Sequence, residues 1–406
     1  MSYHLFEVYG IELEYMLIDS NTFKVNPIVD KLLTKKHGAL TSDVSNGKIE
    51  WSNELVAHVV EIKTNGPTSA IEDLDALFAE NVSEMNQLLR EFDSRLLPSA
   101  AHPLMHPQTE TKLWEHEHSE IYTLYNRIFD CSGHGWSNVQ SMHINLPFSG
   151  DEEFGKLHAA VRLLLPIIPG LAASSPLFEG KKTGFKDARM EVYKTNQKEI
   201  PEMTGKVIPE QVFTKKEYAE VIFEPIKKQI RKYDTDNILD KHFLNSRGAI
   251  ARFDRNAIEI RVIDLQEAPK ADLAIAILII ESLKLLVSEE LISFEDQKQW
   301  HEEDLFDIFN AVVKDAENAQ IENLAFLDVF DLQGKTLVKD IWFKLYERVK
   351  SNISVRHRES IEFLLNNGSL ATRILKVLGD EPSEGRIKEV YLDLADCLEQ
   401  NKFFKP

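Results

Sequence analysis

Near its start the chain alternates apolar residues with carboxylates, and this alternation is typical of a β-strand. In the stretch "GIELEY", which begins at Gly10, apolar and acidic residues take alternate positions, so Glu12 and Glu14 share one parity. Because residues two apart in a strand point to the same face, we expect both carboxylates on one face of a sheet. The pattern predicts a strand over residues 5–19 with one apolar face and one acidic face.

The same alternation returns in two later stretches. "SMHINL" places His143 and Asn145 on one parity, and "NAIEIRVID" places Glu259 and Arg261 on one parity. A sheet face that contacts only water would more often carry lysine, threonine, serine and glutamine. The choice of carboxylate, imidazole and guanidinium groups therefore favours a functional face over a merely solvated one, although a satisfied structural histidine and a surface ion pair are the simpler readings.

A further predicted strand, "ELVAHVVEIKT", contains Glu54 and Glu61. The two residues are seven apart, so a regular strand would point them to opposite faces. Either Glu54 precedes the strand or a bulge intervenes. Glu54 is for this reason the weaker candidate for the acidic face.

The remaining periodicity predicts a mixture of helices and strands in no regular alternation. Strands are expected over 5–19, 54–64 and 141–148, with one or two strands over 249–266, and helices are expected over 69–96 with Ser69 as N-cap, 153–173, 219–233 and 271–292. A long loop is expected over 180–212, and mostly helices after 292. This order favours an α+β fold with an antiparallel sheet over a doubly wound parallel sheet. We expect a catalytic domain at 1–291 and a helical region at 292–406 packed on it.

Composition narrows the class of protein. The chain has 406 residues, of which 43% are hydrophobic, as expected for a folded protein. Its net charge of −19 argues against a nucleic-acid binder and against binding to anionic membranes. Two apolar stretches, at 157–178 and 271–291, are too interrupted to span a membrane and predict buried helices. The two cysteines form no CxxC motif, and the N-terminus lacks the layout of a signal peptide, so we expect a cytoplasmic protein.

Several carboxylates on one sheet face repel each other unless a cation lies among them. A set of carboxylate oxygens with one imidazole suits Mg²⁺ or Mn²⁺ better than zinc. The stretch "GKKT" does not form a phosphate loop, because the earlier glycine of that motif is replaced by Ser175.

Taken together, these stretches resemble a known protein family. The ordered set "GIELEYMLID", "NELVAHVVEIKT", "SMHINLPF", "SSPLFEGKKTGFKDAR" and "AIEIRVIDLQ" is similar to the glutamate–cysteine ligase family, which includes bacterial carboxylate–amine ligases. The resemblance covers residues 9–266 and does not extend to the last third of the chain. It implies a glutamine-synthetase-like fold, with an antiparallel sheet curved around the active site and flanked by helices.

The resemblance also implies roles for individual residues. The metal ligands would be Glu12, Glu14, Glu54, Glu61, His143 and Glu259. Arg261 would contact the transferred phosphate, and Arg189 would lie near the substrate, although Arg247, Arg252 or Arg255 could serve instead. Asn145 and Arg252 are expected to contact the ATP cofactor.

The implied activity is an ATP- and Mg²⁺-dependent ligation, with Mn²⁺ as an alternative ion. It would join the glutamate side chain to the amine of cysteine through an acyl phosphate, the first step of glutathione synthesis. A ligase with a different amine or carboxylate is one alternative interpretation of the function, and three others are not excluded by the sequence. They are a guanidino-kinase-like phosphotransferase, a glycosidase that uses two carboxylates, and a binding protein without turnover. The expected partners are small molecules, and the oligomeric state is left open.

Overall fold

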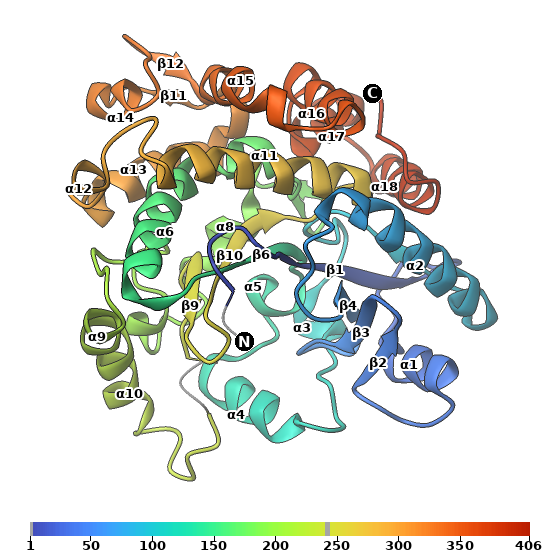
Figure 1. The fold of residues 1–406 in the computed structure, drawn as a ribbon. Coiled ribbons are helices and arrows are strands. Elements are labelled where there is room, and N and C mark those ends of the chain that lie inside the picture. Colours follow the sequence, from blue (N-terminus) through green and yellow to red (C-terminus); the bar gives the residue numbers. More distant parts are fainter. Residues whose placement is uncertain (1–2, 240–243) are drawn as a thin grey trace.

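A computed structural model describes residues 3–239 and 244–406 of the chain (Figure 1). Within this part, an eight-stranded sheet has the order β2-β3-β4-β1-β6-β10-β9, with β5 also paired to β1. The strands are β1 (Gly10–Asp19), β2 (Asp43–Asn46), β3 (Ile49–Asn53), β4 (Val59–Thr64), β5 (Ser94–Leu97), β6 (Ser141–Pro147), β9 (Ala249–Arg252) and β10 (Ala257–Asp264). Every pairing in this sheet is antiparallel, which confirms the predicted fold class.

Helices lie on both faces of the sheet. Up to β10 and its following helix they are α1 (Val29–His37), α2 (Leu74–Leu89), α3 (Pro107–Glu110), α4 (Ser119–Phe129), α5 (His134–Ser137), α6 (Gly150–Leu164), α7 (Pro169–Ala172), α8 (Ala188–Tyr193), α9 (Lys215–Tyr218), α10 (Glu224–Ile230) and α11 (Pro269–Val287). The predicted apolar parity is confirmed, because Ile11, Leu13 and Tyr15 are fully buried in one hydrophobic cluster with residues of α2, α6 and α11.

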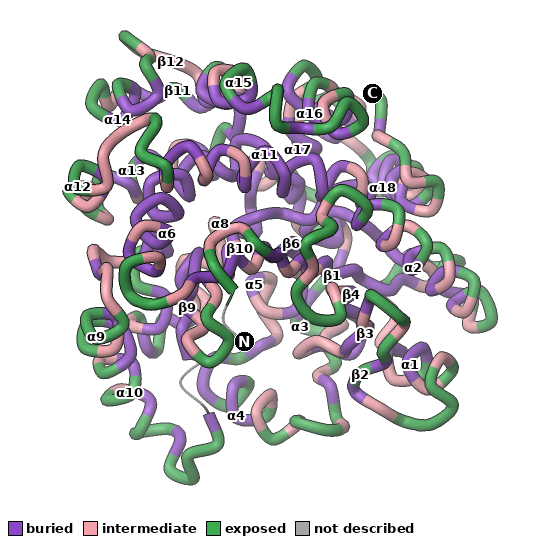
Figure 2. The backbone as a smooth tube through the Cα atoms, in the orientation of Figure 1, coloured by how far each residue is buried: buried purple, intermediate pink, exposed green. Residues whose placement is uncertain are grey.

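The region after residue 292 is mostly helical, as predicted. It contains α12 (Phe294–Gln297), α13 (Glu302–Asp315), α14 (Leu324–Asp328), α15 (Val338–Val349), α16 (Val355–Asn367), α17 (Leu370–Leu378) and α18 (Glu384–Glu399). Two-residue strands β7 (Leu177–Phe178), β8 (Lys181–Lys182), β11 (Gln320–Ile321) and β12 (Thr336–Leu337) form two small ladders. α11 lies between the sheet and these later helices and is buried along most of its length (Figure 2).

Several predicted element boundaries are wrong. The first strand begins at Gly10 and not at residue 5, because the chain turns at Phe6, whose φ is 61°. The predicted helix 69–96 is α2 with a short 3₁₀ turn on either side, and Ser69 is not its cap. Its last residues form β5, which pairs with the second half of β1. Local periodicity did not reveal this strand because its hydrogen bonds depend on a distant partner.

Prolines and turns account for the other differences. The predicted helix 153–173 is divided at Pro166 and Pro169 into α6, a 3₁₀ turn and α7. The predicted loop 180–212 contains α8, and the helix expected to reach residue 292 ends at Val287. The predicted strand 54–64 is reduced to β4, whereas the prediction of one or two strands over 249–266 is confirmed by β9 and β10.

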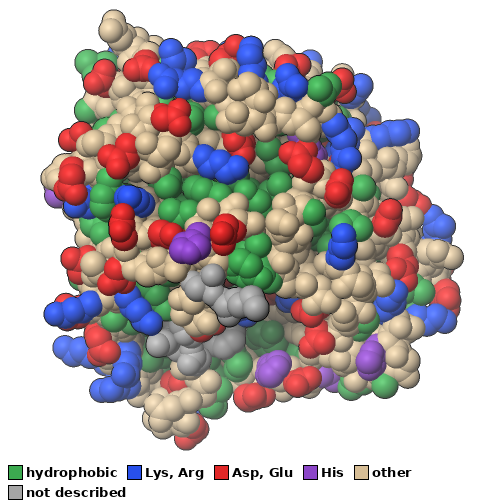
Figure 3. Space-filling view, viewed as in Figure 1, with side chains coloured by type: hydrophobic (Ala, Val, Ile, Leu, Met, Phe, Trp, Pro, Cys, Tyr) green, Lys and Arg blue, Asp and Glu red, His purple; other side chains and the backbone are tan. Residues whose placement is uncertain are grey.

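Charged side chains of both signs are spread over the face shown in Figure 3. No helix in the described part of the chain is both long and apolar enough to cross a bilayer.

Three buried histidines should make the stability of the fold depend on pH. Burial lowers the pKa of His58 and His102 to about 4 and that of His158 to about 3. An unfolded chain has histidine pKa values near 6.5, so below that pH the unfolded state binds more protons. These histidines therefore stabilise the fold fully above about pH 6.5, and their contribution is lost as the pH falls toward about 4.

The variant His158→Phe isolates one of these contributions, because the ring is stacked on Phe154 and contacts Tyr218. Between pH 7 and pH 5 the wild type should lose about 2 kcal/mol more unfolding free energy than the variant. Urea unfolding at the two pH values measures this difference. Equal losses in both proteins would contradict a neutral, buried His158.

Candidate active site

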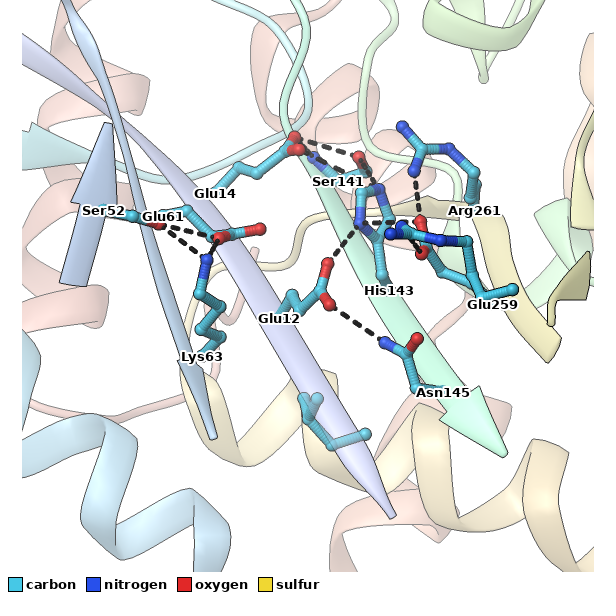
Figure 4. Close-up of polar contacts among 12 residues, drawn as sticks. Glu12, Glu14, Ser52, Glu61, Lys63, Ser141, His143, Asn145, Glu259 and Arg261 are labelled. Carbon is cyan, nitrogen blue, oxygen red and sulfur yellow. Dashed lines mark hydrogen bonds and ion pairs between the residues drawn. The ribbon is translucent and has the colours of Figure 1, made fainter. Parts of the chain in front are cut away.

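A cavity of about 840 Å³ lies over the polar face of the sheet. Residues of β1, β4, β6 and β10 line it from the sheet, and residues of α4, α5 and α8 line it from the other side. The three strand patterns found in the sequence thus meet in one cavity, as Figure 4 shows for the labelled side chains.

The register between β1 and β6 brings the first two patterns together. Glu12 lies directly opposite His143, and Gly10 lies opposite Asn145. The His143 Nδ1 atom lies 2.9 Å from Glu12 Oε2, and the Asn145 side-chain amide donates a hydrogen bond of 3.0 Å to Glu12 Oε1. Gly10 has no side chain in this place, and a Cβ there would lie 3.1 Å from the Cβ of Asn145.

Glu14 lies further along β1 on the same face. Its Oε2 atom accepts hydrogen bonds from the backbone N–H and the hydroxyl of Ser141, at 2.7 and 2.9 Å. The same hydroxyl lies 2.9 Å from His143 Nε2, so Ser141 links Glu14 to His143. The sequence reasoning missed Ser141, although it shares the parity of His143 at the start of the strand.

The third pattern completes a group that could bind a metal ion. Glu259 on β10 lies opposite Asn145 on β6, and its Oε1 atom is 3.9 Å from His143 Nδ1. One ligand atom each of Glu12, His143 and Glu259 lies within 4.8 Å of the others. Two carboxylates and one imidazole are ligands that Mg²⁺ or Mn²⁺ accepts. The donor set therefore fits a divalent cation.

Two arginines hold Glu259. Arg261 Nη1 makes a close ion pair with Glu259 Oε1, and Arg252 Nη1 lies 3.3 Å from Glu259 Oε2. Arg261 and Glu259 share a face of β10, as the parity predicted. Burial alone would raise the pKa of Glu12, but the hydrogen bond and charge of His143, with the charges of Lys63 and Arg261, lower it well below its usual range. Glu12 is therefore a carboxylate at neutral pH.

A second group of carboxylates lies on the β3–β4 side of the cavity. Burial, with the nearby charges of Glu12 and Glu14, raises the pKa of Glu61 to about 7, although Lys63 opposes this shift. Burial and the charges of Glu14 and Glu61 raise the pKa of Glu54 as well. Carboxylates crowded in this way repel each other, and a cation among them would relieve the repulsion.

The position of Glu54 resolves an alternative that the sequence left open. Glu54 follows β3 and precedes β4, so it is not in the same strand as Glu61. Both side chains nevertheless line the cavity. The loop between the two strands therefore brings Glu54 to the acidic face without a bulge in β4.

The structure separates the four candidate substrate arginines. Arg189 on α8 is 2% exposed, lines the cavity and makes a close ion pair with the fully buried Asp264. Arg247 is buried in an ion pair with Glu210 at 2.6 Å and is not among the described residues that line the cavity. Arg252 and Arg255 both line it.

Aromatic residues that sequence reasoning did not single out line the other wall. Tyr122 and Tyr125 lie on α4, Trp136 lies on α5, and Tyr193 ends α8. The helical pattern of α4 gave no signal for this role, because aromatic residues on a helix usually pack in a core. Only the placement of α4 and α5 across from the sheet brings them to the cavity.

Comparisons with known proteins agree with this geometry. The model of glutamate–cysteine ligase family 2 (GCS2) matches residues 8–393, so the expectation that the resemblance ends before the last third of the chain is wrong. An uncharacterized protein from Archaeoglobus fulgidus is 31% identical over 395 residues, which cover 97% of this chain and 99% of that protein.

Two solved structures share the fold at 12% sequence identity. The glutamate–cysteine ligase of Francisella tularensis, solved in complex with AMP, has a TM-score of 0.65 over 97% of this chain and 88% of that one. A bifunctional glutathione synthetase from Pasteurella multocida has a TM-score of 0.58 over 98% of this chain. This chain covers 52% of that larger protein, about half its length.

Proposed function

The chain belongs to glutamate–cysteine ligase family 2, and from this premise we propose that it joins the side-chain carboxylate of glutamate to the amine of cysteine, using ATP. Family and fold make it an ATP-dependent carboxylate–amine ligase. The choice of glutamate and cysteine rests on the family alone. A different amine or carboxylate would leave the same chemistry in place.

One observation supports a phosphate-transferring site above the others. Glu12, His143 and Glu259 converge within 4.8 Å, and Arg261 lies beside them in the same cavity. Phosphoryl transfer requires positioning and neutralised charge more than a covalent protein group. A divalent cation held by the carboxylate cluster, together with the adjacent arginine, would provide both requirements.

The proposed reaction has two steps. A carboxylate oxygen of the donor attacks the γ-phosphorus of ATP, and the bond to ADP breaks to give an acyl phosphate. The neutral amine of the acceptor then attacks the acyl carbon, the carbon–oxygen bond to phosphate breaks, and the amine loses a proton. The products are the amide, ADP and phosphate.

The residues around the cavity take separate roles in this proposal. Glu12, Glu14, His143 and Glu259 would hold a divalent ion, and Glu54 and Glu61 are the candidate ligands on the β3–β4 side. Mg²⁺ or Mn²⁺ bound there would neutralise phosphate oxygens and align the reacting groups. His143 would bind as the neutral imidazole.

The arginines and Asn145 act on the substrates themselves. Arg261 points its guanidinium group into the cavity and would form a forked contact to the transferred phosphate. Arg252 and Asn145 are proposed contacts to ATP. Arg189, held by Asp264, would present its remaining N–H groups toward the substrate carboxylate.

Residues 1–291 would form the catalytic domain, and 292–406 would pack on it as part of the same unit.

A screen of amino-acid pairs tests the proposed reaction. With ATP and Mg²⁺, phosphate release should be greatest with glutamate plus cysteine, and mass spectrometry should detect one γ-glutamylcysteine per ADP formed. Excess EDTA should stop the reaction, and added Mg²⁺ or Mn²⁺ should restore it.

Three negative results of this screen would each reject a different part of the proposal. No stimulation by glutamate with any amine would reject glutamate as the donor while leaving a ligase. ADP formation without an amide product would instead indicate a phosphotransferase. Full turnover in excess EDTA would reject the metal-dependent mechanism altogether.

A further inference from the structure

Lys63 lies among the carboxylates of the polar sheet face, and the roles proposed above do not use it. The antiparallel register pairs it with Glu12 on β1, while Glu61 pairs with Glu14. Because Lys63 and Glu61 are two apart on β4, their side chains leave the sheet on the same side. The lysine is therefore placed in this face by strand register and not by a flexible loop.

The ammonium group is surrounded by oxygen atoms (Figure 4). Lys63 Nζ makes a close ion pair with Glu61 Oε2, donates a hydrogen bond of 2.9 Å to Ser52 Oγ, and lies 3.8 Å from Glu50 Oε1. Ser52 also donates a hydrogen bond of 2.8 Å to Glu61 Oε2. The Glu61 side chain is 8% exposed and the Lys63 side chain 28%, so water reaches this ion pair only from the side of the lysine.

The other basic residues that line the cavity lie on elements other than β1, β3 and β4. Among the described lining residues, the arginines belong to α8 and to the segment 252–261, whereas Lys63 is the one basic residue from β1, β3 or β4. Glu61 therefore has Lys63 as its ion-pair partner on this half of the sheet, and the charges of Glu61, Glu12 and Glu54 raise the pKa of Lys63 against the effect of burial.

We propose that the Lys63 ammonium group takes the place of one divalent ion beside Glu61, so that the enzyme without nucleotide binds metal at Glu12, His143 and Glu259 and not at Glu61. A divalent ion on Glu61 would lie within a few ångströms of a fixed positive charge, and like charges at such a distance repel strongly away from bulk water. This inference rests on the proposed metal-dependent function.

Binding of Mn²⁺ to the full-length protein without nucleotide tests this role, with free Mn²⁺ measured by electron paramagnetic resonance. Lys63→Met keeps most of the side-chain length but removes the charge, and leaves Glu54 and Glu61 without their cation. We expect this variant to bind one additional Mn²⁺ per chain, or to bind Mn²⁺ at a second site about tenfold more tightly than the wild type does. Lys63→Arg keeps the charge and should match the wild type.

Glu61→Gln provides an independent test that keeps Lys63 in place. In the wild-type background it should change Mn²⁺ affinity by less than about twofold, because in the nucleotide-free protein Glu61 binds the lysine and not the metal. In the Lys63→Met background it should remove the additional site.

Three results would count against the proposal. Unchanged Mn²⁺ binding in Lys63→Met would overturn it, and so would a loss of about tenfold in Mn²⁺ affinity from Glu61→Gln alone, since Glu61 would then already be a ligand. A wild-type protein that binds no Mn²⁺ without nucleotide would overturn this inference, whereas the metal-dependent function would still be decided by turnover in excess EDTA. The readout does not depend on turnover, so an error in the assigned substrates would leave it intact.

Discussion

Replacing Arg261 with lysine should lower the turnover number by about a hundredfold or more, the scale of losing one donor that stabilises a transition state. Arg261 lies on the polar face of β10, contacts Glu259 and lines the cavity. Lysine keeps the positive charge but loses the planar fork that can donate two parallel hydrogen bonds to phosphate. The variant should remain folded, because the Arg261 side chain is 31% exposed and the replacement leaves no cavity in the core.

Steady-state rates and metal titrations distinguish this role from that of Glu259. Glu259→Gln removes a charge from the proposed metal ligands while nearly keeping the shape, so apparent Mg²⁺ affinity should fall and added metal should partly restore the rate. Arg261→Lys should leave Mg²⁺ affinity nearly unchanged. Arg386→Lys, an exposed arginine on α18, is the matched control. Near-normal turnover in both site variants would indicate that Glu259 and Arg261 form only a structural ion pair.

Replacing Arg373 with methionine should lower the free energy of unfolding by about 3–5 kcal/mol, as expected when one partner of a buried ion pair is removed. Arg373 on α17 is bound to Glu267, which follows β10, and both side chains are at most 1% exposed. Arg373 Nη1 also donates a hydrogen bond of 2.9 Å to the carbonyl of Phe404. Without the arginine, Glu267 would remain as an unpaired buried charge.

Chemical denaturation measures this loss, and two further variants identify its cause. Arg373→Met combined with Glu267→Gln should be more stable than Arg373→Met alone, because the unpaired charge is gone. Arg386→Met disrupts an exposed pair with Glu389 and should change stability by less than about 1 kcal/mol.

A single cooperative transition in the wild type would support the proposal that 292–406 is part of the same folding unit. Two separate transitions, with Arg373→Met affecting only one, would contradict it.

The local alternation of apolar and polar residues was sufficient to predict which side chains share each face of a strand. The apolar parity of β1, β6 and β10 faces the helices, and the opposite parity, with Glu12, Glu14, His143 and Glu259, faces the cavity. Side-chain direction in a strand alternates regardless of what the strand pairs with, so a single sequence contains this information. The helical last third was predictable because periodicity is a local property, and the antiparallel class followed from the irregular order of the predicted strands and helices.

Pairing between distant segments was not predictable in this way. Ser94–Leu97 continues a helical pattern in the sequence, yet it forms β5 because β1 offers unpaired backbone groups there. The Lys63–Glu12 register and the arrival of Glu54 from a loop are likewise set by strand pairing. Hydrogen bonds between strands depend on which partner lies alongside, and no spacing within one strand specifies that partner.

Which side chains share a strand face could be predicted from residue order alone, and with the family resemblance this order indicated the chemistry that those side chains suit. Which of them meet depends on the folded chain, as in the contact of Glu12 with His143, or of Arg189 with Asp264 in place of the other arginines. The reason is that side-chain direction follows from the dihedral angles of each residue, whereas a distance between strands follows from the packing of the whole sheet against its helices.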